Sequence, residues 1–293
     1  MLNIKPENLR TFVTVADCGT LQEASEILGR TPSAISMSLK QLSEQLGAEL
    51  FETDRKSNLT PTGRFVLEES RRALSGFDES VRTIQRYTKG EMGVVRIAAV
   101  PSVASHLLPD VVSRFQEKSP SVRLELRDTD SVMVATAVRN GSVDCGIASL
   151  SFASKDLQHE LLLEEPFGLV CRPDHPLAAT QHPLPWSALE GVDFISNGLC
   201  SQIRDESFSQ INSDTLIQVY NIVTLLGFIH QGMGVTLLPR LAMTDQSELC
   251  FLPLADKAAV RRLYFLQHKH HRISPAGMVF KGEVTRGFTG QIA

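Results

Sequence analysis

Apolar residues recur at helical spacing in three short segments near the start of the chain, and a glycine follows each segment. The segments stop at Gly19, Gly29 and Gly47, because glycine readily adopts the left-handed conformation that ends a helix. Thr20 and Thr31 stand before the second and third segments, where a side-chain oxygen can cap the first turn. The pattern therefore predicts three helices joined by tight turns.

The second and third predicted helices, TLQEASEILGRTPSAISMSLKQLSEQLG at residues 20–47, match the helix-turn-helix pattern. In that motif the second helix enters the major groove by its N-terminal residues. The residues there that lie off the apolar stripe are Pro32, Ser33, Ser36, Met37 and Lys40. Small side chains let a helix approach base edges and phosphates, so these residues are candidates for DNA binding. An αα-hairpin in another kind of helical domain would have the same short pattern.

A basic polar segment, LFETDRKSNLTPTG, follows at residues 50–63. It predicts either a β-wing whose Arg55 and Lys56 contact a DNA backbone, or a solvated loop. No acidic residue lies between positions 27 and 43, so a duplex facing the third helix would meet the positive charge of Lys40.

Thr60 and Pro61 are typical of a helix start and predict a long helix that ends at about residue 89. Along this helix, residues recur at alternating spacings of three and four, namely Leu67, Ser70, Leu74, Phe77, Val81 and Ile84. This spacing is typical of a coiled-coil seam, so the helix is expected to pair two copies of the chain. A helix that packs only on its own domain is the alternative, because the repeat is short.

From Val94 onward, short apolar strand-like segments alternate with amphipathic helical ones. The strand-like segments are VVRIAAV at 94–100, VRLEL at 122–126, VDCGIAS at 143–149, FGLVC at 167–171, DFIS at 193–196, IQVY at 217–220, GVTLLP at 234–239 and RRLYFLQ at 261–267. Helices are expected near residues 107–118 and 131–140 and from about residue 274. The alternation predicts parallel α/β layers arranged as two small lobes.

The composition of the 293-residue chain, with 42% hydrophobic and 21% charged residues, is that of a globular protein with more than one domain. No apolar run approaches the length of a membrane span, and the N-terminal residues lack a signal-peptide pattern, so a cytoplasmic protein without a membrane partner is expected. The net charge of -4 gives no overall sign of a nucleic-acid partner. The five cysteines are scattered singly, which argues against a disulfide framework or a zinc site.

Together these features resemble the LysR-type transcriptional regulators. The resemblance rests on the segment TPSAIS at 31–36 and on Leu9, Phe12, Val15, Gly19, Ala24, Leu28, Leu39, Leu42, Leu46, Gly47, Leu50, Phe51, Leu59, Thr60 and Gly63. It implies a multidomain α/β protein, with a winged helix-turn-helix domain at 1–60, a dimerisation linker helix at 61–90 and a two-lobed, periplasmic-binding-protein-like effector domain at 91–293. The first lobe would comprise residues 91–162 and 268–293, and the second lobe residues 163–267.

The same resemblance assigns DNA contacts to the third helix and the wing, at Thr31, Pro32, Ser33, Ser36, Met37, Lys40, Arg55 and Lys56. Two positions depart from the family pattern. Thr53 stands where the family usually has an arginine, so one phosphate contact is missing or taken over by Arg55. Met37 stands where the family often has glutamine or arginine, and it offers only an apolar contact, for example to a thymine methyl group.

In open α/β sheets, ligands bind beyond the carboxyl ends of the strands, near helix N-termini. The candidates at those ends are Pro101, Ser102, Val103, Thr129, Asp130, Ser131, Ser149, Ser196, Asn197, Cys200, Ser201 and Met233. Hydroxyl groups and helix N-termini favour an anion such as a carboxylate, although no arginine stands out at these strand ends. Serine and threonine also occur at such positions simply as helix caps, which is the alternative.

Cys200 occupies the position at which peroxide-sensing members resembling OxyR carry a reactive cysteine. Ser209 stands in the stretch where those members have a resolving cysteine, so we expect an inert, pocket-lining thiol and no disulfide switch. The segment HKHHR at 268–272 has the composition of a metal-binding tract. A solvated crossover between the lobes is the expected role, because no cysteine or carboxylate stands at ligand spacing.

The sequence therefore predicts a ligand-responsive transcriptional regulator that binds double-stranded DNA as a homodimer or homotetramer, with a small-molecule effector between its lobes. We expect no cofactor and no enzymatic activity, because the chain lacks a nucleophile with a neighbouring base, a GxxxxGK phosphate loop and a metal-ligand set. Two alternatives remain. One is a cytoplasmic two-lobed solute-binding protein or enzyme with a helical appendage, and the other is a DNA-binding thiol sensor based on Cys200.

Overall fold

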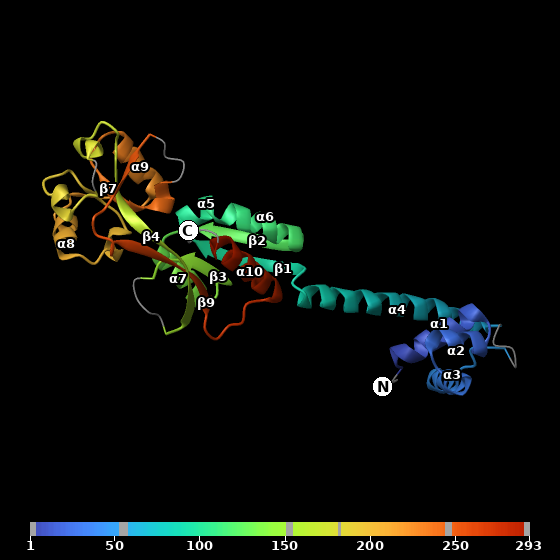
Figure 1. The fold of residues 1–293 in the computed structure, drawn as a ribbon. Coiled ribbons are helices and arrows are strands. Elements are labelled where there is room, and N and C mark those ends of the chain that lie inside the picture. The colour runs from blue at the N-terminus through green and yellow to red at the C-terminus, as the bar shows by residue number, and fades with distance from the viewer. Residues whose placement is uncertain (1–3, 53–57, 151–154, 181–182, 244–247, 290–293) are drawn as a thin grey trace. The chain divides into compact units, whose positions relative to one another are not determined.

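The computed structural model describes residues 4–52, 58–150, 155–180, 183–243 and 248–289. The chain divides into two compact units after Arg86 (Figure 1). Among the helices in the described ranges, none is long and apolar enough to span a bilayer.

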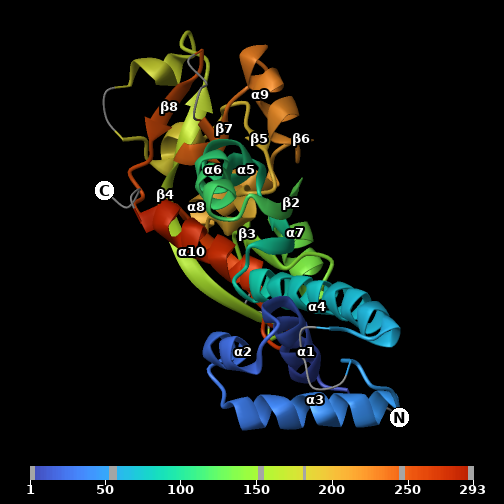
Figure 2. The same ribbon diagram turned by 90° about the vertical axis from the view of Figure 1, so that its right-hand side faces the viewer.

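The first unit begins with the three predicted helices, gathered into one bundle (Figure 2). They are α1 (Pro6–Cys18), α2 (Leu21–Leu28) and α3 (Pro32–Leu46). The predicted caps are present: Thr20 Oγ1 accepts a hydrogen bond from the Glu23 backbone N–H at 3.2 Å, and Thr31 Oγ1 accepts one from Ala34 at 3.3 Å. The local sequence signals therefore fix where these helices begin.

One hydrophobic core holds the three helices and the next segment together. Ile35, Leu39 and Leu42 point from α3 into this core, and the rings of Phe12 and Phe51 meet edge to face with their centroids 5.5 Å apart. Phe51 also forms an antiparallel bridge with Leu59. The two arms of the predicted wing therefore pair, whereas its tip at residues 53–57 lies outside the described residues.

The long predicted helix is α4 (Pro61–Thr88). Thr60 Oγ1 caps it by accepting from the Gly63 N–H at 2.8 Å. Farther along, Ser70 and Leu74 are buried, and Arg71 pairs with Asp17 of α1. The first half of α4 therefore packs on its own domain.

The second unit contains a mixed sheet with the strand order β2-β1-β3-β9-β4-β7, and β8 pairs with β4. Its strands are β1 (Met92–Ala99), β2 (Ser121–Asp128), β3 (Cys145–Ala148), β4 (Leu157–Cys171), β7 (Thr236–Pro239), β8 (Cys250–Pro253) and β9 (Val260–His268). β1 is parallel to β2 and β3, but β9 is antiparallel to β3. The prediction of parallel layers is therefore wrong for β9, which is antiparallel to β3 and β4, and for β7, which is antiparallel to β4.

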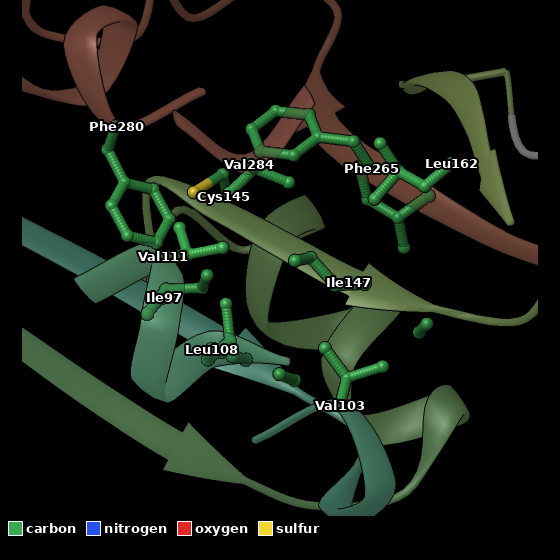
Figure 3. Close-up of a cluster of buried hydrophobic side chains, with 14 of the residues drawn as sticks. Ile97, Val103, Leu108, Val111, Cys145, Ile147, Leu162, Phe265, Phe280 and Val284 are labelled. Atoms are coloured by element: carbon green, nitrogen blue, oxygen red, sulfur yellow. The ribbon is translucent and has the colours of Figure 1, made fainter. Parts of the chain in front are cut away.

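The first lobe packs helices on β1, β2 and β3 around one core (Figure 3). These helices are α5 (Pro101–His106), α6 (Leu108–Lys118), α7 (Ser131–Arg139) and α10 (Pro275–Thr289). Ile97 and Ile147 supply strand side chains to the core, and Phe115 of α6 meets Phe280 of α10 edge to face at 5.3 Å.

The second lobe buries apolar clusters on both faces of β4 and β7. It includes the strands β5 (Ile195–Ser196) and β6 (Ile217–Gln218), the helices α8 (Glu206–Ser213) and α9 (Ile222–His230), and 3-10 turns at Pro176–Ala179, Trp186–Leu189, Cys200–Gln202 and Arg240–Met243. The strand prediction missed β8 and the first ten residues of β4. The latter segment is rich in charged and exposed side chains, so it lacks the apolar run that marks a buried strand.

β4 and β9 run side by side and connect the two lobes (Figure 1). β4 pairs with β9 along residues 157–166 and with β7 along residues 167–170. β9 residues 264–267 pair with β3, which belongs to the first lobe. This register favours a crossing near residue 263 instead of the predicted residue 268, and the remaining domain boundaries stay predictions.

Candidate DNA-binding surface and effector site

The N-terminal half of α3 presents an exposed face made of predicted DNA-binding residues. Thr31, Pro32, Ser33, Ser36 and Lys40 are exposed, and Met37 is 72% exposed. The Thr31 hydroxyl is already engaged as the helix cap, so its role here is to begin the helix. Arg55 and Lys56, the predicted wing contacts, lie outside the described residues.

The opposite side of α3 fixes the orientation of this face. Ser38 is buried and its hydroxyl donates to Asn8 Oδ1 of α1 at 3.0 Å. Sequence reasoning missed this pair, because an apolar-pattern analysis does not identify a polar contact between residues 30 positions apart. Ser38 and Asn8 therefore act as positioning residues for the exposed face.

The charges on and near this face are available to an anionic partner. Lys40 Nζ lies 3.9 Å from Glu44 Oε1, and both side chains are more than half exposed. An exposed pair at this distance contributes little free energy, so a phosphate group could replace Glu44. Arg64 is a further exposed cation beside the wing, where its Nη1 donates to the Leu59 carbonyl at 3.2 Å. Its position three residues into α4 is the sequence signal that could have identified it.

The carboxyl ends of β1, β2 and β3 meet at one edge of the sheet, as predicted for a ligand site. The Val100 N–H donates to Ile147 O, and the Thr129 N–H donates to Ala99 O, each at 3.0 Å. The Ser149 N–H donates to Ser131 Oγ at 3.3 Å. The structure therefore brings the candidates after these strands together.

The candidates at this edge differ in what they can offer a ligand. Val103 is fully buried, so its side chain belongs to the core of the first lobe, and a ligand contact at this position stays a prediction. Pro101 is exposed. Ser149 is 4% exposed, and its hydroxyl has no hydrogen-bond partner among the described residues. A buried hydroxyl without a hydrogen-bond partner lowers the stability of the folded protein. Among these candidates, Ser149 would therefore gain most from a hydrogen bond to a ligand.

The N-terminus of α7 at this edge is already capped by a side chain, whereas the N-terminus of α5 after β1 has no side-chain cap. Asp130 Oδ1 accepts from the N–H groups of Val132 and Met133, both at 2.9 Å, at the start of α7. Asn221 caps α9 in the same way. The first N–H groups of α7 and α9 are thus occupied, and the anionic effector stays a prediction.

The candidates in the second lobe are mostly engaged in internal hydrogen bonds. Ser196 Oγ donates to Asn212 Oδ1 at 2.7 Å, and Asn197 Nδ2 donates to Thr236 Oγ1 at 2.9 Å. Ser201 Oγ donates to the Gly198 carbonyl at 3.0 Å. Met233, in the turn between α9 and β7, is 45% exposed. The polar candidates of this lobe are therefore used to support its loops, and their contact with an effector stays a prediction.

A buried arginine that sequence reasoning missed lies next to Ser102. Arg261, at the start of β9, is 1% exposed, and its Nη2 donates to Ser102 Oγ at 3.0 Å. Its Nε donates to Glu165 Oε1 of β4 at 2.8 Å. The sequence contains two adjacent glutamates, Glu164 and Glu165, and two adjacent arginines, Arg261 and Arg262. Only the strand register shows that the glutamates lie opposite the arginines.

Cys200 lies in a 3-10 turn of the second lobe and is 2% exposed. Burial raises the pKa of its thiol to about 12, so little thiolate exists near neutral pH. Ser209, on α8, is exposed and uses its hydroxyl to donate to the Asp205 carbonyl. These surroundings favour the inert thiol over the Cys200 redox sensor.

The histidine-rich segment at 268–272 forms a compact turn after β9. His268 Nδ1 accepts from the backbone N–H groups of His270 and His271 at 3.1 and 3.2 Å, and the rings of His268 and His271 stack at 4.0 Å. Within the described ranges, no three histidine, cysteine, aspartate or glutamate side chains come together as a metal site. His268 stabilises the turn through its two hydrogen bonds to the backbone.

Comparisons with known proteins cover almost the full length of the chain. Residues 6–64 match the bacterial regulatory helix-turn-helix proteins of the lysR family, and residues 88–288 match the LysR substrate binding domain. The HTH-type transcriptional regulator YbhD of Escherichia coli (strain K12) is 29% identical over 284 residues, which are 93% of this chain and 88% of that protein. A probable hydrogen peroxide-inducible genes activator of Mycobacterium leprae (strain TN) is 26% identical over 260 residues, 86% of this chain and 83% of that protein. Full-length CbnR complexed with its target DNA has a TM-score of 0.72 at 16% identity, over 97% of this chain and 99% of that chain.

Proposed function

The chain belongs to the LysR family of DNA-binding transcriptional regulators, and we propose that the exposed face of α3 reads the duplex while a small molecule in the second unit regulates binding. The observation that carries the DNA proposal is the combination of small side chains, Met37 and Lys40 on one exposed helical face. Small residues permit close approach to the groove, Met37 offers an apolar contact to a base, and Lys40 offers charge to a phosphate. We assign the remaining phosphate contacts to the wing, at Arg55 and Lys56.

Fluorescence anisotropy on random-sequence duplex across a salt series tests this assignment. Each phosphate contact releases counterions, so the slope of log K against log salt concentration reports their number. We expect the slope to become shallower by about one to two units when Lys40→Ala is combined with Arg55→Ala. Lys257→Ala is a matched control, because this exposed lysine lies in the second unit. An unchanged slope in the double variant would contradict the assignment, and absent duplex binding would favour a two-lobed solute-binding protein.

For the effector, we propose a small molecule at the carboxyl ends of β1, β2 and β3, with a polar group hydrogen-bonded to Ser149. The buried hydroxyl of Ser149, which has no hydrogen-bond partner in the described part of the chain, supports this position. Arg261 stands behind Ser102 at the same edge, so a ligand that displaces the Ser102 hydroxyl would also change the surroundings of the Arg261–Glu165 pair. A change in that pair links ligand binding to the strands that join the lobes.

We further propose that two copies pair through the second half of α4, where Phe77 and Ile84 are 45% and 62% exposed at predicted seam positions. A charge at the seam would oppose this packing. Light scattering after size exclusion should show that Ile84→Glu has half the mass of the wild type. The variant would be a monomer if the wild type is a dimer, and a dimer if the wild type is a tetramer. Thr83→Glu, which changes an exposed neighbour off the seam, should retain the wild-type mass. A wild-type monomer would exclude the proposal.

A further inference from the structure

Two cysteines that are far apart in the sequence are direct neighbours across strands β4 and β8. Cys171 ends β4 and Cys250 begins β8, and the antiparallel register makes them partners. Directly opposed residues in an antiparallel pair have Cα atoms about 4.5 or 5.5 Å apart. Both separations fall within the range of about 4.4–6.8 Å that a disulfide spans. The backbone therefore already has the spacing of a cross-strand disulfide.

The two side chains also lie on the same face of the sheet. Cys171 is part of the hydrophobic cluster with Leu169 and Leu237, and Cys250 packs against the same cluster. Their sequence neighbours Val170 and Leu249 belong to the cluster on the other face, as strand alternation requires. Burial raises the pKa of Cys171 to about 11, and the negative charge of a nearby Cys250 thiolate would raise it as well. The two sulfur atoms therefore share one environment.

The pair is asymmetric in its access to solvent. Cys171 is fully buried, whereas Cys250 is partly exposed on β8, whose ladder pairing among the described strands is with β4. A small oxidant in solution would reach Cys250 first. Cys171 would then be the resolving thiol beneath it.

We propose that Cys171 and Cys250 form a redox-sensitive dithiol that closes to a disulfide when a hydroperoxide oxidises Cys250. The Cys250 thiolate attacks the terminal peroxide oxygen, the O–O bond breaks, and the leaving alkoxide takes a proton to become an alcohol, or water when the oxidant is hydrogen peroxide. The Cys171 thiol then attacks the resulting sulfenic acid and releases one water molecule as the S–S bond forms. Two thiols are oxidised by two electrons in total, and the peroxide is reduced.

Hydrogen peroxide treatment of the full-length folded protein, followed by alkylation and non-reducing peptide mapping, tests the proposal. We expect a loss of two hydrogens from the intact chain and one cross-linked peptide pair that contains Cys171 and Cys250. Cys200→Ser should give the same cross-link, and Cys250→Ser should lose it. The cross-link ties an edge strand to its neighbour across a long loop, so the oxidised wild type should also have a higher Tm than the reduced protein.

Unfolding the chain in urea before oxidation provides the structural control. The unfolded chain should give a mixture of cysteine pairings, because the strand register no longer selects one pair. The proposal fails if Cys171 and Cys250 are both still alkylated in the folded protein after peroxide treatment. It also fails if Cys250 is oxidised to a sulfinic acid without the cross-link, or if the cross-link forms with Cys200 instead.

Discussion

The guanidinium group of Arg261 lies against the carboxylate of Glu165, with Nε 2.8 Å from Oε1, and the two residues are direct partners across β9 and β4. Arg261 also donates to Ser102 on α5, and Glu165 accepts from the Leu241 N–H, which lies in the 3-10 turn after β7. The buried pair therefore links an element of each lobe to the strands that join them.

Removing the charge of Glu165 should destabilise the protein strongly. In Glu165→Gln the buried Arg261 guanidinium loses its counter-charge, and we expect the free energy of unfolding to fall by about 3–5 kcal/mol. Urea denaturation measures this loss. The adjacent pair of Glu164 and Arg262 is about half exposed, so the control Glu164→Gln should cost less than about 1 kcal/mol. Equal losses in the two variants would contradict the importance of burial.

A methyl group at Gly63 should push α4 away from the backbone at Leu50. An added Cβ would lie 2.0 Å from the Leu50 carbonyl oxygen, which is closer than atoms can approach. We expect Gly63→Ala to lower the free energy of unfolding by about 2 kcal/mol or more, and to lower the temperature at which DNA binding is lost. For Gly76, in the same helix, an added Cβ meets no described atom within 4 Å apart from the helix's own backbone and the adjacent residues, so Gly76→Ala should instead stabilise by about 0.5–1 kcal/mol. Two variants with the same effect would refute the steric argument.

Glu283 should make the stability of the first lobe depend on pH. Its carboxylate is 3% exposed and accepts from Lys118 Nζ at 2.6 Å, and Arg286 and Arg114 lie close to it. The hydrogen bond from Lys118, followed by the nearby cations, lowers the pKa of Glu283 below its ordinary value of 4.5. Because the folded pKa is the lower one, this stabilisation is present above the unfolded pKa and is lost as the pH falls through the folded pKa.

The variant Glu283→Gln isolates this effect. We expect it to lose about 2 kcal/mol at pH 7, because three cations then lack their shared carboxylate. Between about pH 5 and pH 3 its urea midpoint should change less than that of the wild type. If the urea midpoints of the two proteins changed in parallel with pH, other carboxylates would control acid unfolding.

Met37 should influence which sequence is bound without influencing phosphate contacts. Its thioether side chain is 72% exposed, so Met37→Gln should leave the Tm unchanged. Glutamine adds hydrogen-bonding groups that favour adenine, so selection from a random duplex library should give a different base preference at one position of each half-site. The salt slope on random duplex should not change, unlike that of Lys40→Ala. An identical selected sequence for wild type and variant would remove Met37 from the reading face.

Replacing Ser149 should stabilise the ligand-free protein. Its hydroxyl is buried without a partner among the described residues, so Ser149→Ala removes a desolvation cost of about 1 kcal/mol or more. Ser102→Ala is the matched control, because it deletes an acceptor of Arg261 and should lower the free energy of unfolding. Urea denaturation of both variants should show a higher free energy of unfolding for Ser149→Ala and a lower one for Ser102→Ala. A loss of stability in Ser149→Ala would mean that its hydroxyl has a partner in solution.

The sequence by itself determined the elements whose signals are local. The helices α2, α3 and α4 begin directly after Thr20, Thr31 and Thr60, because one side-chain oxygen and the next backbone N–H groups are enough to cap a helix. The exposed face of α3 followed from the apolar positions on its other side. The alternation of strands and helices likewise indicated a two-lobed α/β unit. The spacing of apolar residues and the length of each strand or helix can be recognised within a short segment.

Only the tertiary structure decided which distant residues meet. The direction of β9, the partners Glu165 and Arg261, and the partners Cys171 and Cys250 all depend on strand register. A register is chosen by the packing of whole faces, so no short segment encodes it. The burial of Val103 and Ser149 could not be predicted from the sequence for the same reason. Both follow a strand end, but the Val103 side chain is part of the core, whereas the buried Ser149 hydroxyl has no hydrogen-bond partner among the described residues.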